Sequence, residues 1–193
     1  MTKFILLGGY LSKATDGGKA FIEELVTGHG ESPKVLICLF ARLQEFWPDI
    51  FAREEQSFKA YLPDKTPELR LAKHDIFVEQ VRWADVVYFR GGSSEAMTES
   101  LVERPEWKKD LAGKTIAGSS AGADALSTYY YGLDTREVRS GTGLLPIKMI
   151  PHFKSDYHGW EFDWDKAEAE LKAYKEDLPI MALREGEFKV FNR

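Results

Sequence analysis

The alternation of short apolar runs with longer amphipathic stretches is the feature that most constrains how this chain can fold. The apolar runs have the length of β-strands, and the stretches between them repeat apolar residues at helical spacing. Strands and helices that alternate in this way build βαβ units around a mostly parallel sheet. The predicted strands cover residues 4–7, 35–41, 69–71, 86–89, 115–117, 148–150, 180–183 and 188–191.

The predicted helices lie between these strands. One of them, residues 47–61, has apolar side chains on one side and directs Glu54 and Glu55 toward solvent. No linker, repeat or low-complexity tract interrupts the series, so we expect residues 1–193 to form a single domain. Its fold class is α/β, a three-layer αβα sandwich with a mostly parallel central sheet. The other predicted helices cover residues 17–27, 76–83, 95–102, 121–131 and 164–174.

Composition excludes several classes of protein. A chain of 193 residues is long enough to bury a core without disulfides or a structural metal. Its 26 basic and 31 acidic residues give a net charge of −5, which argues against a nucleic-acid partner. The apolar runs are too short for a membrane span or a signal peptide, so we expect a cytoplasmic protein without a membrane partner. The one cysteine, Cys38, lies in an apolar run and is expected in the core.

A candidate nucleophile follows the predicted strand at residues 115–117. The segment Gly118-Ser119-Ser120-Ala121-Gly122 matches the G-x-S-x-G pattern of a nucleophile elbow, in which a sharp strand-to-helix turn exposes the central serine. Ser120 is that serine, and the helix N-terminus with the Ala121 N–H can stabilise an oxyanion. The same residues also fit a tight glycine turn in which Ser119 or Ser120 only caps the helix.

A nucleophilic serine needs a base within hydrogen-bond reach. Of the four histidines, His152 is the best candidate, because it follows the predicted strand at residues 148–150 and a strand end positions a side chain firmly. His158 lies in the polar loop that follows. His29 and His74 fall in polar connections and are interpreted as surface residues.

Two carboxylates compete for the role of the acid that orients the base. Glu185 follows the predicted strand at residues 180–183, and Asp134 lies in a loop beyond the elbow. Either residue type can accept a hydrogen bond from an imidazole, so the residues alone leave both candidates open. A serine, a histidine and a carboxylate together require no metal and no organic cofactor.

Four segments of the chain resemble the peptidase E (aspartyl dipeptidase) family of serine peptidases, whose fold is similar to that of class I glutamine amidotransferases. Their order and spacing match the family over most of the chain. The elbow followed about thirty residues later by Pro-His-Phe is a fairly specific combination. The segments are residues 89–94 (FRGGSS), 118–123 (GSSAGA), 150–153 (IPHF) and 182–186 (ALREG).

The resemblance implies a Ser–His–Glu triad, which falls here on Ser120, His152 and Glu185. It also implies an oxyanion hole formed by the backbone N–H groups of Gly92 and Ala121. The expected activity is hydrolysis of short peptides, in the manner of a dipeptidase, through an acyl-enzyme. The expected partner is a small peptide substrate, bound by a monomer or a homodimer.

The resemblance also suggests substrate-binding residues. Asp134 matches a family aspartate connected with substrate or catalysis, and Arg90 and His158 are further candidates. One position departs from the family, because Asp163 stands where relatives have an arginine able to pair with the side chain of an N-terminal Asp residue. The acidic segment around Asp163 either binds a free α-amino group or begins a helix, with Asp163 or Asp165 as its N-cap.

Two other functions fit parts of the pattern. The order Ser120, Asp134, His152 is that of an α/β-hydrolase esterase, although the short interval between serine and acid leaves no room for the usual βα units. A non-catalytic amidotransferase-like domain that binds a metabolite or a partner is the other alternative, with the serine as an inert turn residue.

Overall fold

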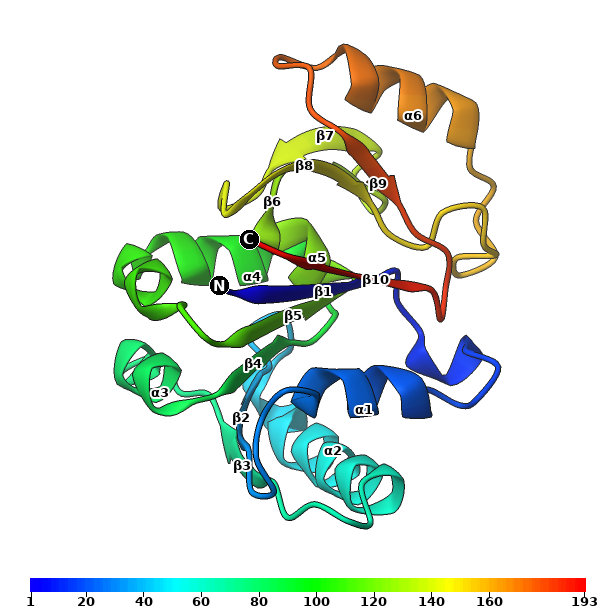
Figure 1. The fold of residues 1–193 in the computed structure, drawn as a ribbon. Coiled ribbons are helices and arrows are strands. Elements are labelled where there is room, and N and C mark those ends of the chain that lie inside the picture. Colours follow the sequence, from blue (N-terminus) through cyan, green and yellow to red (C-terminus); the bar gives the residue numbers. More distant parts are fainter.

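The computed structural model describes residues 1–193 and arranges them in two β-sheets with helices around them (Figure 1). The larger sheet has the strand order β10-β1-β5-β4-β2-β3, and only β10 runs antiparallel to its neighbour. Its strands β1 and β4 are buried along all or nearly all of their length, in runs of apolar residues, as expected for strands covered on both faces. The strands are β1 (Lys3–Leu7), β2 (Lys34–Cys38), β3 (Glu68–Leu71), β4 (Val86–Phe89), β5 (Thr115–Ser119) and β10 (Phe188–Asn192).

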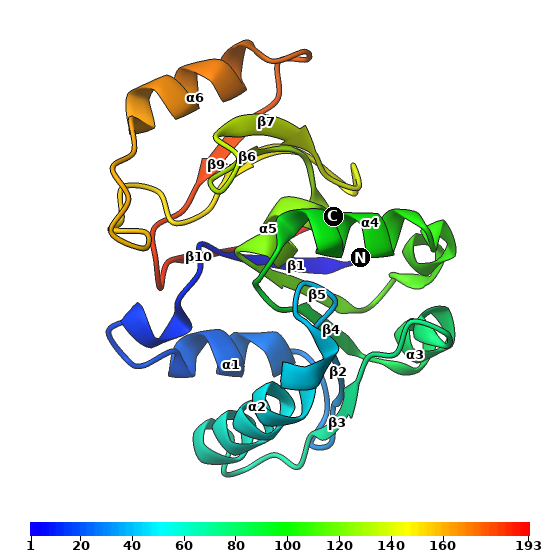
Figure 2. The same ribbon diagram turned by 180° about the vertical axis from the view of Figure 1, so that it is seen from behind.

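Helices cover both faces of this sheet. From β1 the chain crosses to β2 and moves outward to β3, and then returns to β4 and β5, which fill the positions between β2 and β1. Because crossover connections are right-handed, this reversal puts α1 and α2 on one face and α3 and α4 on the other (Figures 1 and 2). The helices are α1 (Lys19–Val26), α2 (Trp47–Tyr61), α3 (Phe77–Trp83) and α4 (Ser94–Val102), with 3-10 turns η1 (Leu11–Lys13), η2 (Gln44–Phe46) and η3 (Pro105–Asp110).

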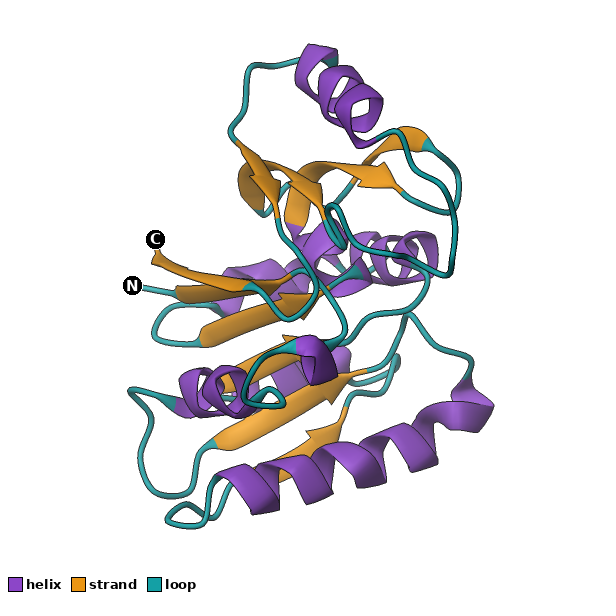
Figure 3. Cartoon of the chain, turned by 90° about the vertical axis from the view of Figure 1, so that its right-hand side faces the viewer, coloured by secondary structure: helices purple, strands orange, loops and turns teal.

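The smaller sheet has the strand order β7-β6-β8-β9. Helix α5 (Ala121–Leu126) lies between the two sheets, and α6 (Trp164–Ala173) packs on the outer face of the smaller one (Figure 3). Tyrosine, leucine and isoleucine side chains of the sheet and of α6 form a separate small core there. The strands are β6 (Ser127–Gly132), β7 (Glu137–Ser140), β8 (Leu145–Ile150) and β9 (Ile180–Ala182).

The α/β class and the mostly parallel pairing are confirmed, but the second half of the chain differs from the sequence prediction in two places. The helix expected at residues 121–131 ends at Leu126, and residues 127–132 form strand β6. The Ser127 hydroxyl donates to the Asp124 carbonyl at 2.7 Å and closes the helix, while the following threonine and three tyrosines favour a strand. The polar strand β7 was not expected at all, and it pairs with β6 at the edge of the second sheet.

The interior is apolar and continuous under the larger sheet. Cys38 is fully buried in β2, in agreement with its expected place in the core. None of the helices combines the length and the apolar character that crossing a bilayer would require.

The two sheets meet at the carboxyl end of β1, where Gly8 and Gly9 follow the last strand residue. The Gly8 carbonyl accepts the N–H of His152, which follows β8, at 2.8 Å. The Gly9 carbonyl accepts the N–H of Gly186, which follows β9, at 2.9 Å. Loops after β1, β5, β8 and β9 are therefore gathered at one edge, the position where ligands bind in open α/β sheets.

Trp107 tests the packing of the larger core. It is fully buried, with its ring centroid 5.4 Å from that of Phe89 and 6.4 Å from that of Phe77. Trp107→Ala leaves a cavity, so the free energy of unfolding should fall by about 3–5 kcal/mol in urea denaturation. Trp160→Ala, at a side chain that is 43% exposed, should lower it by less than about 1 kcal/mol. Equal losses in the two variants would contradict the packing described here.

Candidate active site

Ser120 occupies the turn between β5 and α5. Its backbone lies at φ 50° and ψ −114°, outside the regions that a serine ordinarily adopts, and such a conformation costs about 1–3 kcal/mol. The turn is held by a hydrogen bond from the Ser120 N–H to the Leu7 carbonyl of β1, at 3.0 Å. Gly122 permits the close approach, because a Cβ there would overlap the Phe89 carbonyl of β4.

Three side chains form a continuous hydrogen-bonded chain at this turn. Ser120 Oγ lies 2.9 Å from Nε2 of His152, and Nδ1 of the same imidazole lies 3.0 Å from Oε1 of Glu185. A carboxylate only accepts hydrogen bonds, so the imidazole donates from Nδ1 and keeps the lone pair of Nε2 for the serine hydroxyl. The carboxylate in contact with the imidazole is Glu185, and Asp134 makes no hydrogen bond to it.

The backbone explains why His152 points at the serine. His152 has φ 54°, a left-handed conformation that turns the chain sharply after β8. Its ring packs over Gly9, where any Cβ would overlap the imidazole. The absence of a side chain at Gly9 therefore leaves the space that the base occupies.

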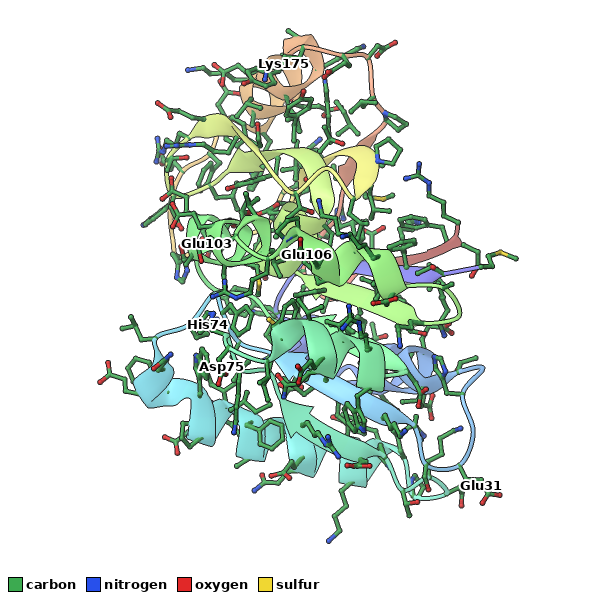
Figure 4. The ribbon with its side chains drawn as sticks, turned by 90° about the vertical axis from the view of Figure 1, so that its left-hand side faces the viewer. Glu31, His74, Asp75, Glu103, Glu106 and Lys175 are labelled. Atoms are coloured by element: carbon green, nitrogen blue, oxygen red, sulfur yellow. The ribbon has the colours of Figure 1, made fainter.

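The remaining predicted residues divide into two groups. Asp134 and His158 are exposed and line the same cavity as the serine. His29 and His74 lie elsewhere: His29 Nε2 contacts the Thr115 hydroxyl at 2.9 Å. His74 Nδ1 contacts the hydroxyl of Ser100 in α4, and Figure 4 shows it beside Asp75 on the α3 and α4 side of the molecule.

Backbone N–H groups close to the serine are free to bind a ligand. Ala121 is the first residue of α5, so its N–H has no acceptor within the helix. The Gly92 N–H likewise has no backbone acceptor in the chain. Gly91 brings this loop onto the nucleophile, since a Cβ built there would lie 3.1 Å from Ser120 Cβ. Two unpaired donors beside a serine are a geometry suited to a developing oxyanion.

Burial sets the protonation state of the base. His152 is only 3% exposed, and desolvation lowers the pKa of its imidazole below the ordinary value of 6.5. The hydrogen bond and negative charge of Glu185 act in the opposite direction and only partly offset the burial. The imidazole is therefore neutral at neutral pH, the form that can accept a proton.

The serine opens into a cavity of about 800 Å³ whose wall is mostly polar. Tyr10 and Tyr157 flank the imidazole, with ring centroids 5.1 and 4.5 Å from it. Charged groups of both signs border the same space. The charged lining residues are Arg42, Arg53, Glu54, Arg90 and Asp134.

The expectation that Glu54 faces solvent is wrong. Its side chain is 7% exposed and pairs with the Arg90 guanidinium at 3.1 Å. Arg90 also donates to the Tyr88 hydroxyl at 3.1 Å. Helical spacing predicted Glu54 on the outer side of α2. Its carboxylate can be buried because it pairs with the positive charge of Arg90, which follows the end of β4.

Asp163 is the N-cap of α6 and accepts the N–H of Lys166 at 2.9 Å. This position, where relatives are expected to have an arginine, thus begins a helix, as one of the two sequence interpretations held. Its carboxylate is committed to the helix backbone.

A second carboxyl lies beneath the nucleophile, one helical turn after Ser120. Asp124 is 2% exposed, and Oδ2 accepts the Ser94 hydroxyl at 2.7 Å while Oδ1 has no partner. Burial raises the pKa of Asp124 well above its ordinary value, and the Ser94 hydrogen bond only partly opposes this. This hydrogen bond connects the start of α4, which lies two residues after Gly92, to α5, which begins at Ala121.

Asp124→Asn tests this protonation state. A carboxyl whose pKa is raised in the folded protein weakens stability as pH rises above the unfolded value of about 3.9. Between pH 4 and pH 8 the melting temperature of the variant should therefore rise relative to that of wild type. The rise should be about 2–4 °C for each kcal/mol of difference in the free energy of unfolding. Thermal denaturation across this range measures the difference. A difference that does not change with pH would contradict the raised pKa.

Comparison with known structures supports the fold. The crystal structure of a peptidase from an acI-B1 Actinobacterium is similar with a TM-score of 0.70 and 24% sequence identity, over 99% of this chain and 83% of that one. A protein from Listeria monocytogenes EGD-e that is described as a peptidase E is similar with a TM-score of 0.65 and 15% identity, over 99% and 97% of the two chains. No curated protein matches the sequence.

The sequence itself matches a family model. The model of peptidase family S51 covers residues 5–192, which is nearly the whole chain. This match confirms the resemblance to the peptidase E family that the four sequence segments indicated. The chain belongs to peptidase family S51.

Proposed function

We propose that this member of family S51 is a serine exopeptidase that hydrolyses short peptides with a free amino terminus through an acyl-enzyme. The observation that carries the proposal is the hydrogen-bonded chain from Ser120 through His152 to Glu185. The neutral state of His152 and the unpaired N–H groups beside the serine support the same reaction.

In the first half of the proposed reaction, Ser120 Oγ attacks the scissile carbonyl carbon while His152 Nε2 takes its proton. Glu185 holds the imidazole in the tautomer with Nδ1 protonated and stabilises the imidazolium that forms. The negative charge on the carbonyl oxygen develops against the N–H groups of Gly92 and Ala121. His152 then gives its proton to the leaving amine as the C–N bond breaks.

In the second half, water enters on the side that the amine has left. His152 removes a proton from the water, the hydroxide attacks the acyl carbon, and Ser120 regains its proton as the ester bond breaks. Every step uses side chains and backbone groups of this chain, so the proposed reaction balances without a cofactor.

Asp134 is our proposed partner for the free amino group of the substrate. It is exposed to the cavity and makes no ion pair or hydrogen bond within the chain. The amino nitrogen of a substrate lies only two bonds from the scissile carbon, so a carboxylate on the wall of the cavity is suitably placed to pair with it. His158 and Arg90 border the same space and stay candidate substrate contacts.

The proposal is tested with free-amine dipeptides (Asp-Leu, Glu-Leu, Ala-Leu, Gly-Leu) and an amino-blocked control. Wild type should cleave the free dipeptides, and Ser120→Ala should lower kcat/KM by at least about 1,000-fold because the nucleophile is gone. Ser119→Ala, the adjacent serine, should retain turnover and labelling by a fluorophosphonate.

The other outcomes discriminate the alternatives. Turnover of esters but not of peptides would favour an esterase. Absence of both turnover and labelling at Ser120 would leave the elbow without a catalytic role and favour a non-catalytic binding domain.

The pH profile tests the role of the base. Because kcat/KM requires neutral His152, it should fall at acid pH with a midpoint below 6.5 and be level near neutrality. Glu185→Gln removes a charge that raises the pKa of His152, so the acid limb should move to lower pH. The maximal rate should fall by about 100-fold or more, since the imidazolium loses its partner. An acid limb that stays in place or moves upward would contradict the assignment of Glu185.

A further inference from the structure

The cavity holds a positive charge that the chain itself does not neutralise. Arg42, four residues beyond the last residue of β2, makes one side-chain hydrogen bond, from Nε to the Gly91 carbonyl at 2.6 Å. Its two terminal nitrogens have no partner in the chain, and no carboxylate lies within ion-pair distance of them. Arg90, by contrast, is paired with Glu54. An unpaired guanidinium on a cavity wall is suited to a carboxylate of a ligand.

Gly91 connects Arg42 to the nucleophile. The carbonyl that it binds belongs to Gly91, and a Cβ on Gly91 would lie 3.6 Å from Ser120 Oγ. The guanidinium is therefore anchored to the loop that contacts Ser120, with its free N–H groups available to the cavity. Arg53 also borders the cavity without an ion pair, but its Nε donates to the Asp49 carbonyl of its own helix at 3.2 Å, whereas Arg42 is bound to the loop that contacts Ser120.

Arg42 and His152 border the same cavity. Tyr10 and Tyr157 pack against the imidazole and line this cavity together with Arg42. His152 delivers its proton to the leaving amine, so the leaving residue must lie in the cavity to which Arg42 presents its free N–H groups.

Bond lengths make the contact feasible for a dipeptide. In a dipeptide the terminal carboxylate carbon is three bonds from the scissile carbon, at most about 4 Å away. A longer peptide has a neutral amide at this point. A free dipeptide thus carries an ammonium group on one side of the scissile bond and a carboxylate on the other, which matches the unpaired Asp134 and Arg42.

We propose that Arg42 binds the terminal carboxylate of the leaving residue and thereby restricts cleavage to dipeptides. The inference rests on the proposed peptidase function, and it adds a specificity-determining residue on the leaving-group side. Its hydrogen bond to Gly91 positions the guanidinium, and its terminal nitrogens make the contact with substrate.

The kinetic test compares Ala-Leu with Ala-Leu amide, which lacks only the terminal negative charge. Wild type should prefer Ala-Leu, and Arg42→Gln should lower kcat/KM for Ala-Leu by about 10- to 100-fold, mainly through KM, while leaving the amide nearly unchanged. Arg42→Lys keeps the charge and should recover part of the loss. Arg82→Gln, at a surface pair with Asp110, should behave like wild type.

Three results would overturn the proposal. Equal losses for the acid and the amide would mean that Arg42 acts only by holding the Gly91 loop. The same selective loss in Arg53→Gln, with Arg42→Gln unaffected, would assign the contact to the other arginine. A loss seen with Asp-Leu but not with Asn-Leu would assign the bound carboxylate to the side chain of the first residue.

Binding separates this proposal from the proposed function. Calorimetric titration of Ser120→Ala with Ala-Leu and with its amide needs no turnover. Selective loss of Ala-Leu binding in Ser120→Ala/Arg42→Gln would support the Arg42 contact even if wild type proved inactive. Absence of any preference for Ala-Leu over the amide in Ser120→Ala would refute the contact whatever the activity of wild type.

Discussion

The contact between the end of β1 and the imidazole of His152 is the constraint on which the candidate site depends. Gly8 accepts the His152 N–H, and Gly9 leaves the space that the ring fills. Gly9 also accepts the N–H of Gly186, next to Glu185, while the neighbouring strand β5 carries Ser120. One strand end therefore fixes the distances among groups that come from three distant parts of the chain and from two sheets.

The free-energy cost of burying a charge explains which charged groups around the cavity are paired and which are not. A buried ion without a partner is unfavourable by several kcal/mol, so it pairs or becomes neutral. Arg90 pairs with Glu54, and burial raises the pKa of Asp124, which favours its neutral form. Arg42, Arg53 and Asp134 border the cavity, and none of them has a charged partner in the chain. The groups left without a charged partner are ones that solvent or a ligand can reach, and they include both signs.

Much of the larger sheet could be predicted from sequence, because strands buried on both faces are continuous apolar runs and the helices between them have clear periodicity. The pattern of apolar residues shows that a strand is buried, but it does not show which sheet the strand belongs to. The sequence therefore gave no sign that β6, β8 and β9 form a second sheet. Residues 127–131 were assigned to the helix that follows the elbow, although their threonine and tyrosines favour a strand. The burial of Glu54 could not be predicted from local sequence either, since its partner Arg90 is distant in sequence.

The residues around the nucleophile were accessible to sequence reasoning because each follows a strand and belongs to a short motif. Arg42 belongs to no motif, and its importance appears only when Gly91 is seen to connect it to Ser120. Asp163, at the position where relatives are expected to supply a cation, is committed to capping α6. The two positions concern different carboxylates: the relatives' arginine would pair with the side chain of the first residue, whereas Arg42 is proposed to bind the terminal carboxylate of the leaving residue, which every dipeptide carries whatever its first residue.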